Sequence, residues 1–299
     1  MYSIIGAVEL GLLYALMALG VYITFRILDF PDLTVDGSFA TGGAIAAVMI
    51  AGGYSPWLAT IVALIGGWIA GTITGILHTK GKVNGLLSGI LMMIALYSIN
   101  MRIMGKPNIS LLKIDTVFTS LPTIPFMIIF VLIVKLLLDA FFKTDLGLAL
   151  RATGDNARMI GSLGANTDNS KILGVGLSNG LVALSGALIA QQSGFADISM
   201  GVGMIVIGLA SVIIGEAIFG NMTVFRATLA AVLGSIVYRI VVAFALKVDW
   251  LDASDLKIIT ALIVVVALVV PTIQRSLNQK RLARKRAIEL SGGDTDAGS

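Results

Sequence analysis

Apolar stretches of about twenty residues recur along the whole chain, and this repetition limits the possible folds more than any other feature. A helix needs about 20 residues to cross the hydrocarbon of a bilayer, and a backbone in lipid must satisfy its hydrogen bonds within such helices. Hydrophobic residues make up 57% of the 299-residue chain and charged residues 13%, roughly half the charged fraction of ordinary soluble domains. The sequence therefore predicts an all-α polytopic membrane protein.

We predict nine transmembrane helices in one membrane domain, residues 1–274, followed by a tail, residues 275–299. The tail begins as a basic run that suits anionic lipid headgroups and ends in a polar, disordered stretch. The expected spans are 2–25, 36–52, 55–77, 84–101, 122–142, 171–191, 201–219, 225–246 and 257–274.

The basic residues predict the orientation, because Lys and Arg collect on the cytoplasmic side of a membrane. An odd number of spans places the two chain ends on opposite sides. With the N-terminus outside and the C-terminus in the cytoplasm, most basic residues fall in cytoplasmic segments. The external segments then hold only Arg102, Lys106, Lys113, Lys247 and Lys257.

Two short motifs echo each other, Phe30-Pro31-Asp32-Leu33-Thr34 and Phe195-Ala196-Asp197-Ile198-Ser199. Each follows a long predicted span and precedes one that glycines interrupt, and the predicted topology places them on opposite faces. The pattern predicts an inverted repeat, with spans one to four matching spans six to nine around the fifth. Transporters commonly use this arrangement.

Polar side chains at the start of the second and seventh spans are candidates for a solute pathway or gate. A helix N-terminus has unpaired N–H groups and partial positive charge, so a discontinuous span starting there could hold a carboxylate. The simpler interpretation is that Asp36 and Ser199 are N-caps. Phe30 and Phe195 could stack on an aromatic solute or anchor the chain at the interface. The candidates are Phe30, Asp32, Thr34, Asp36, Ser38, Phe195, Asp197 and Ser199.

Charged side chains within spans are costly and need a partner or a function. We expect Lys135 to extend to the cytoplasmic surface and Glu216 to pair with Arg226 at a cytoplasmic turn. Glu9 and Arg239 lie in the outer parts of their spans, where they could pair across the bundle or line a gate.

Glycines at a spacing of four residues mark the third span, at Gly67, Gly71 and Gly75. Small residues at this spacing let two helix backbones approach closely. We therefore expect helix packing here rather than a hinge or a dimer seam.

The polar segment between the fifth and sixth spans contains its own helix stops. Gly154 suits the left-handed end of one helix, Asp155 can cap the next, and Gly164 can end that one. Asn166 or Thr167 could then cap the sixth span. The pattern predicts two short helices at the cytoplasmic surface, either a rigid element that an ATPase can push or an interfacial helix resting on lipid.

Several motifs resemble one known family. Leu150-Arg151-Ala152, then Met159, then Leu163-Gly164-Ala165-Asn166-Thr167 resembles the coupling segment of permeases from the branched-chain amino acid importers of the ATP-binding cassette (ABC) class. The stretch from Asp29 to Phe39 resembles the branch assigned to tryptophan, tyrosine or related solutes. The resemblance covers nearly the whole chain, to about Pro271. It implies coupling to an ATPase through Arg151, Gly154, Asp155, Met159, Leu163, Gly164 and Asn166.

The same resemblance implies a permease subunit that moves a small amino-acid-like solute, aromatic or branched-chain, inward by alternating access. It also implies a second permease copy in a homodimer or pseudodimer, a cytoplasmic ATPase dimer and an extracytoplasmic solute-binding protein, in the plasma (inner) membrane of a prokaryote. The chain contains no Gly-x-x-x-x-Gly-Lys-Ser/Thr sequence. We therefore expect this chain to hold no cofactor, and ATP and Mg to be bound by the partner ATPase.

The alternative is an ion-coupled secondary transporter of a small organic solute, which can share inverted repeats but should place coupling carboxylates at the bilayer midplane. Only Glu9 comes near that position. An enzyme is not expected, because the chain lacks cysteine, a His-Glu-x-x-His motif and a paired-Asp protease motif, and its single His78 cannot build a metal site. The cations flank apolar spans, so nothing indicates nucleic-acid binding.

Overall fold

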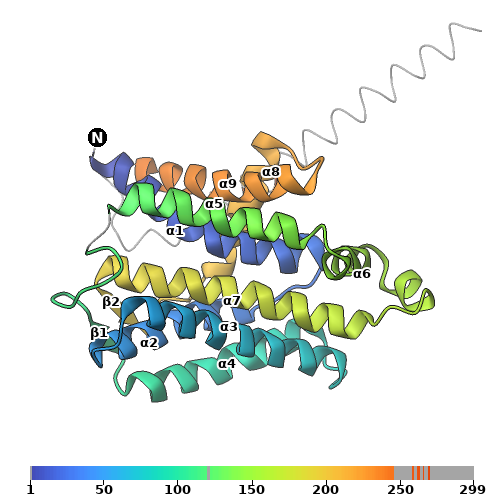
Figure 1. Ribbon diagram of the computed structural model, residues 1–299, viewed down its shortest axis with the longest axis horizontal. Helices are drawn as coiled ribbons and strands as arrows, with labels where there is room; N and C mark the ends of the chain where they lie inside the picture. Colours follow the sequence, from blue (N-terminus) through green and yellow to red (C-terminus); the bar gives the residue numbers. More distant parts are fainter. Residues whose placement is uncertain are drawn as a thin grey trace, which may run out of the picture.

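The computed structural model describes residues 2–119 and 122–245, together with residues 258, 261, 262, 265 and 269. This part of the chain is helical apart from two short strands and the connecting loops (Figure 1). In chain order the elements are α1 (Tyr2–Val21), the π-helical turn η1 (Tyr22–Ile27), α2 (Thr34–Ala51), α3 (Pro56–Thr79), α4 (Gly85–Met104), β1 (Asn108–Ser110), α5 (Thr123–Phe141), α6 (Asp145–Ser162), α7 (Thr167–Ser193), β2 (Phe195–Asp197), α8 (Met204–Phe219) and α9 (Val224–Ala245).

Each of the first eight predicted spans corresponds to a helix. Seven helices in the described ranges are long and apolar enough to cross a membrane, namely α1 continued by η1, α2, α3, α4, α5, α7 and α9. The predicted seventh span, 201–219, is α8, which has only 16 residues. The predicted ninth span, 257–274, and the tail, 275–299, lie outside the described residues, apart from the five single positions given above, which are helical.

Helix α7 is the central helix of the bundle. Within its apolar window 83% of the residues are buried, and it packs against α1, α2 and α3. Glycines make these contacts close: a Cβ added to Gly186 would lie 2.0 Å from the Phe39 carbonyl oxygen, and one on Gly67 would lie 2.4 Å from the Asn179 carbonyl oxygen. The prediction that the glycine face of the third span serves close helix packing is confirmed, since Gly67, Gly71 and Gly75 all face α7.

A two-stranded sheet closes one end of the bundle, and α6 projects from the opposite end (Figure 1). Strands β1 and β2 pair antiparallel, with Asn108 opposite Asp197 and Ser110 opposite Phe195. The side-chain oxygen of Gln191 accepts a hydrogen bond from the Val117 N–H at 3.2 Å. These bonds attach the long loop after α4 to the end of α7, and they fix the start of the segment that leads into α8.

Two predictions about charged residues are wrong. Lys135 does not reach the surface: it is 2% exposed and pairs with Asp139, one turn further along α5, at 2.5 Å. Glu216 pairs with Arg26 at 2.9 Å rather than with Arg226, because η1 places Arg26 beside the end of α8. The partners are therefore Asp139 for Lys135 and Arg26 for Glu216.

The close contact between α7 and α2 leads to a stability prediction with a matched control. Gly186→Ala places a methyl group against the Phe39 carbonyl, so we expect a loss of about 3 kcal/mol and a melting temperature roughly 5–10 °C lower. Gly6→Ala introduces the same methyl group in helix α1, where no atom lies within 4 Å, and should be neutral or stabilising. Thermal unfolding of the detergent-solubilised protein measures both. Equal melting temperatures for the two variants would contradict the packing described above.

Candidate functional site

Helices α2 and α8 begin inside the bundle rather than at its ends. Asp32, just before α2, accepts a hydrogen bond from the side-chain amide of Asn179, near the middle of α7, at 2.6 Å. From there α2 runs toward the sheet, where Ile50 packs with Ile109 of β1. Helix α8 runs the other way, toward the Arg26–Glu216 pair near its end. The two helices therefore start close together and point toward opposite ends of the molecule.

Asp36 joins the two helix starts. Its carboxylate accepts hydrogen bonds from the backbone N–H groups of Gly203 at 2.9 Å and Ile205 at 2.8 Å. The interpretation of Asp36 as the cap of its own helix is wrong, because the N-cap position of α2 is Leu33 and Asp36 lies in the first turn. It caps α8 instead, where a carboxylate satisfies the first N–H groups and complements the helix dipole.

The echoed motifs share the same local hydrogen bond. In each motif the aspartate accepts a bond from the backbone N–H two residues later, Asp32 from Thr34 at 2.9 Å and Asp197 from Ser199 at 2.8 Å. The Ser199 hydroxyl also donates to Asp197, and the bonds from Ser199 hold the pKa of the Asp197 carboxyl below its usual range. Asp32 is 2% exposed and accepts bonds on both carboxylate oxygens, so it supports the start of α2.

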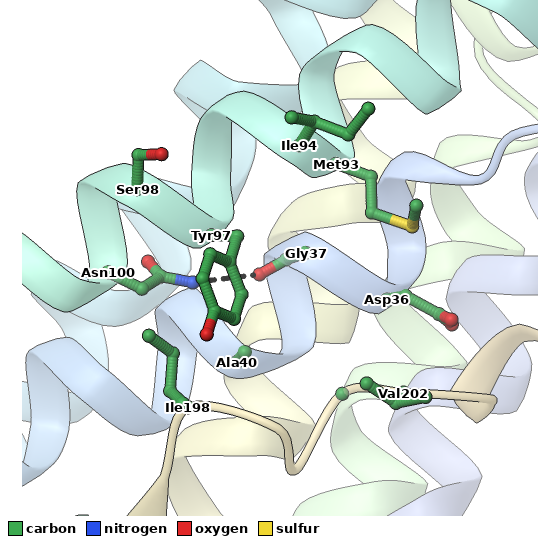
Figure 2. Close-up of a pocket in the computed structure, with 11 residues that line it drawn as sticks. Asp36, Gly37, Ala40, Met93, Ile94, Tyr97, Ser98, Asn100, Ile198 and Val202 are labelled. Atoms are coloured by element: carbon green, nitrogen blue, oxygen red, sulfur yellow. Dashed lines mark hydrogen bonds between the residues drawn. The ribbon is translucent and has the colours of Figure 1, made fainter. Parts of the chain in front are cut away.

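A cavity of about 430 Å³ lies between α2, α4 and the segment 198–202 (Figure 2). Its walls are mostly apolar, and its polar groups come from Asp36, Tyr97, Ser98 and Asn100. The Asn100 amide donates to the Gly37 carbonyl oxygen at 3.4 Å, while its own Oδ1 has no partner in the described part of the chain. Asn100 is 1% exposed, so this acceptor is buried beside the cavity without a donor among the described residues.

A second cavity, of about 390 Å³, brings together three of the predicted pathway residues, Phe195, Asp197 and Ser199. Tyr14 and Phe39 also line it, with stacked rings 6.0 Å apart. The Arg239 guanidinium lies 3.7 Å from the centre of the Tyr14 ring, and in the described ranges no ion pair joins it to Glu9. The cavity therefore combines aromatic walls and a carboxylate, with a cation stacked on one of those walls.

The segment 198–202 separates the two cavities. Ile198, Gly201 and Val202 line the first, and Ser199 and Met200 line the second. A Cβ on Gly201 would lie 1.9 Å from the Asp36 carbonyl oxygen, so this thin wall packs directly on the start of α2. A movement of α8 relative to α2 would change both cavities together.

Three other predicted pathway residues lie away from these cavities. Phe30 is 6% exposed and packs edge-on against His78, with ring centres 5.0 Å apart, so its ring belongs to the core and cannot stack on a solute. The Thr34 hydroxyl lies 2.9 Å from that of Thr74, and Ser38 is fully buried. These side chains help to place α2, and they do not line either cavity.

Helix α6 contains the break predicted for the polar segment, at a different residue. The non-helical residue is Asn156, whose side chain accepts a bond from the Met159 N–H at 3.0 Å, so Asn156 caps the second half in place of Asp155. Gly154 is not in the left-handed region: a Cβ there would lie 1.7 Å from the Ile27 carbonyl oxygen, so Gly154 allows α6 to pack on η1.

The helix stop and the helix cap predicted for the end of this segment are confirmed. Gly164 has a φ of +87°, as a helix-ending glycine should, and Asn166 caps α7 through a bond from the Asn169 N–H at 3.0 Å. Met159 is 53% and Leu163 is 74% exposed. The second half of α6 thus presents apolar side chains away from the bundle.

Asn100, Tyr97 and Asn179 are site residues that the sequence analysis missed. A sequence signal existed for the two asparagines, because an amide within an apolar span needs hydrogen-bond partners that lipid cannot supply. The sequence gives no such signal for Tyr97, which resembles an ordinary aromatic residue of the membrane interface.

The chain is similar in sequence to several known proteins. Residues 3–270 match the family model for the permease component of branched-chain amino acid transport systems. A tyrosine transport system permease protein of Clostridioides difficile is 47% identical over 93% of this chain and 95% of its own length. An uncharacterized protein of Rickettsia prowazekii is 37% identical over 90% of this chain and 97% of its own.

More distant similarities agree with these matches. The autoinducer 2 import system permease protein of Salmonella typhimurium is 26% identical over 85% of this chain and 75% of its own length. A solved structure of a metal-chelate type ABC transporter in an inward-facing conformation has a TM-score of 0.50 and 18% identity, covering 91% of this chain and 85% of the other. That structural similarity supports the fold.

The Asp36 bridge leads to a prediction about local stability. Asp36→Asn removes the charge that receives the two N–H groups at the start of α8, so we expect a local loss of about 1–2 kcal/mol. Amide hydrogen exchange of residues 203–205 should then be roughly tenfold faster. Asp197→Asn is the comparison variant, because the Asp197 carboxylate bonds to Ser199 and to the Asn108 side chain and not to the first N–H groups of α8. Unchanged exchange in Asp36→Asn would show that α8 does not depend on this carboxylate.

Proposed function

The chain belongs to the family of branched-chain amino acid transport permeases, and on that premise we propose that it is the permease subunit of an ABC importer for a small amino-acid-like solute. A member of this family is a transport subunit and not an enzyme, and the family implies an ATPase as its partner. In this proposal ATP and Mg are bound by that partner, and the permease domain comprises residues 1–274.

The single observation that supports a transport pathway best is the pair of helix starts joined by Asp36 between two cavities. The wall between the cavities is the single segment 198–202, and it packs on the start of α2. A small displacement of α8 against α2 would open one cavity and narrow the other, which is what alternating access requires. The opposite directions of α2 and α8 also support the inverted repeat.

An aromatic or branched-chain amino acid suits the first cavity. The unpartnered Asn100 oxygen and the Asp36 carboxylate offer acceptors for an ammonium group, and Met93, Ile94 and Tyr97 offer apolar surface for a side chain. The relative in Clostridioides difficile, named for tyrosine transport, supports the aromatic choice.

A continuous set of contacts connects α6 to the hydrogen bonds that Asp36 makes with the start of α8. Gly154 of α6 packs on Ile27, the neighbouring Arg26 pairs with Glu216 of α8, and the other end of α8 is held by Asp36. In this proposal the ATPase holds the exposed Met159 and Leu163, and the push reaches α8 through η1. The end with α6 is then cytoplasmic, the N-terminus is outside, and the membrane is the plasma (inner) membrane of a prokaryote.

Two further partners complete the assembly. The first cavity is open beside α4, where Ile94 and Tyr97 are 59% and 53% exposed, and a second copy of the permease would close it. The sheet at the external end offers a rigid surface for a solute-binding protein. The ion-coupled alternative is not favoured, because the family match covers most of the chain.

The coupling assignment predicts the effect of glycine substitutions in and after α6. Gly154→Val collides with the Ile27 carbonyl, and Gly164→Val forces a β-branched residue to a φ of +87°. Each should reduce ATP-driven uptake at least about tenfold without preventing membrane insertion. Gly6→Val is the control, because nothing lies within 4 Å of its Cβ position and it lies in α1, outside the proposed coupling element. Wild-type uptake by both Gly154→Val and Gly164→Val would contradict the coupling role.

Reconstitution tests the function itself. The chain is purified with its ATPase and placed in proteoliposomes together with its solute-binding protein. Uptake of labelled tyrosine is then measured with and without ATP. We expect ATP-dependent uptake that falls about tenfold in Asn100→Leu, because the cavity loses an acceptor. Asn169→Leu, which is exposed outside both cavities, should keep it. Accumulation without ATP, driven by an ion gradient, would overturn the proposal.

A further inference from the structure

A third cavity lies where η1, α6 and the turn between α8 and α9 meet, and its volume is about 200 Å³. Unlike the two cavities above, it is lined mainly by polar groups. Arg26 comes from η1, Arg151 and Asp155 come from α6, and Asn221 and Met222 come from the turn. We call this cavity the basal cleft.

Arg26 has unused N–H donors that could bind a ligand in the basal cleft. Its Nε donates to Glu216 Oε1 at 2.9 Å. The Arg26 side chain is 44% exposed, whereas that of Glu216 is 11% exposed. A guanidinium has five N–H donors, so this single bond leaves the terminal nitrogens available.

Arg151 and Asp155 have no ion-pair partner among the described residues. They stand one turn apart on α6, a spacing at which opposite charges on a helix commonly pair. The ion pairs in the described part of the chain are Arg26–Glu216 and Lys135–Asp139, so Arg151 and Asp155 pair neither with each other nor with a neighbour. Both line the basal cleft. The cleft therefore offers one cation and one anion at separate points.

A ligand with both charges suits this arrangement better than one with a single charge. Arg26 and Glu216 neutralise each other, and Arg151 and Asp155 carry one charge of each sign, so the four groups sum to zero. A simple anion would meet Asp155, and a simple cation would meet the two arginines. A zwitterion places each of its charges against the opposite charge of the cleft.

We propose that the basal cleft binds an α-amino acid, with its carboxylate on Arg151 and Arg26 and its ammonium group on Asp155. The volume of about 200 Å³ suits a small solute of this class. The inference rests on the proposed function, because it assigns the transported class of solute to a second site at the α6 end of the bundle.

Such a ligand would act on the coupling contacts. Arg151 belongs to α6 and Arg26 to η1, which is linked to α8 through Glu216. A carboxylate bound by both arginines connects α6 to η1 and, through the Arg26–Glu216 pair, to α8. A ligand that favours one arrangement of α6 and α8 opposes their relative movement. Solute accumulated inside therefore slows its own uptake.

Cysteine protection tests the site directly, because the chain has no cysteine of its own. Met222→Cys places a single thiol on the 85% exposed rim of the cleft in the full-length permease in lipid nanodiscs. The probes are L-tyrosine, L-tryptophan and L-leucine at millimolar concentration. Tyramine lacks the carboxylate, and 3-(4-hydroxyphenyl)propionate lacks the ammonium group. We expect at least one amino acid to slow maleimide labelling severalfold, and neither tyrosine analogue to do so.

Charge variants in the Met222→Cys background identify the groups that hold the ligand. Arg151→Gln and Asp155→Asn should each abolish the protection. Arg158→Gln and Asp168→Asn make the same chemical changes outside the cleft and should keep it. Protection by an analogue as strong as by the amino acid, protection that survives both cleft variants, or protection by none of the three amino acids would overturn the inference.

Uptake into preloaded vesicles separates this inference from the proposed function. Proteoliposomes containing the full complex are loaded with unlabelled amino acid or left empty, and each variant is compared with its own rate from empty vesicles. Preloading should slow uptake severalfold in the wild type and in Arg158→Gln, and much less in Arg151→Gln. ATP-dependent uptake that preloading leaves unchanged contradicts the feedback site alone. Absence of ATP-dependent uptake contradicts the proposed function.

Discussion

The structure depends on one requirement, that a helix starting inside an apolar bundle must find acceptors for its first N–H groups. Asp36 meets it for α8 through Gly203 and Ile205, and Asp32 meets it for α2 through Thr34. Because each carboxylate is tied to a particular backbone, two helices can begin away from the bundle ends without leaving unpaired polar groups in lipid. Both cavities lie beside these internal helix starts.

The position of α8 follows from restraints at both its ends. At its start, the sheet between β1 and β2 holds the preceding segment and Asp36 holds the first turn. At its end, Glu216 pairs with Arg26, next to the contact of η1 with α6. Helix α8 also packs closely on α9, where a Cβ on Gly215 would lie 1.9 Å from the Ala230 carbonyl oxygen, so the two helices would shift together. The proposed transport movement and the proposed feedback site both involve a shift of this pair against the rest of the bundle.

Local pattern was enough for the helices and for several of their ends. Gly164 has its predicted role, and Asn166, one of the two predicted caps, begins α7, because a left-handed glycine and an asparagine cap act on the residues beside them. Gly154 was misread, since its role is to admit the Ile27 carbonyl, a neighbour distant in sequence. The same limit explains why Glu216 was paired with the wrong arginine.

The sequence by itself determined which segments are helical and apolar, because the hydrophobic effect and backbone hydrogen bonding act on every stretch of about twenty residues independently. It also pointed to both aspartate motifs. Only the tertiary structure decided that Asp36 caps α8, that Phe30 is buried, and that the Asn100 oxygen finds no donor among the described residues. These facts depend on which helices meet, and helix packing is set by the shapes of many side chains together rather than by any local pattern.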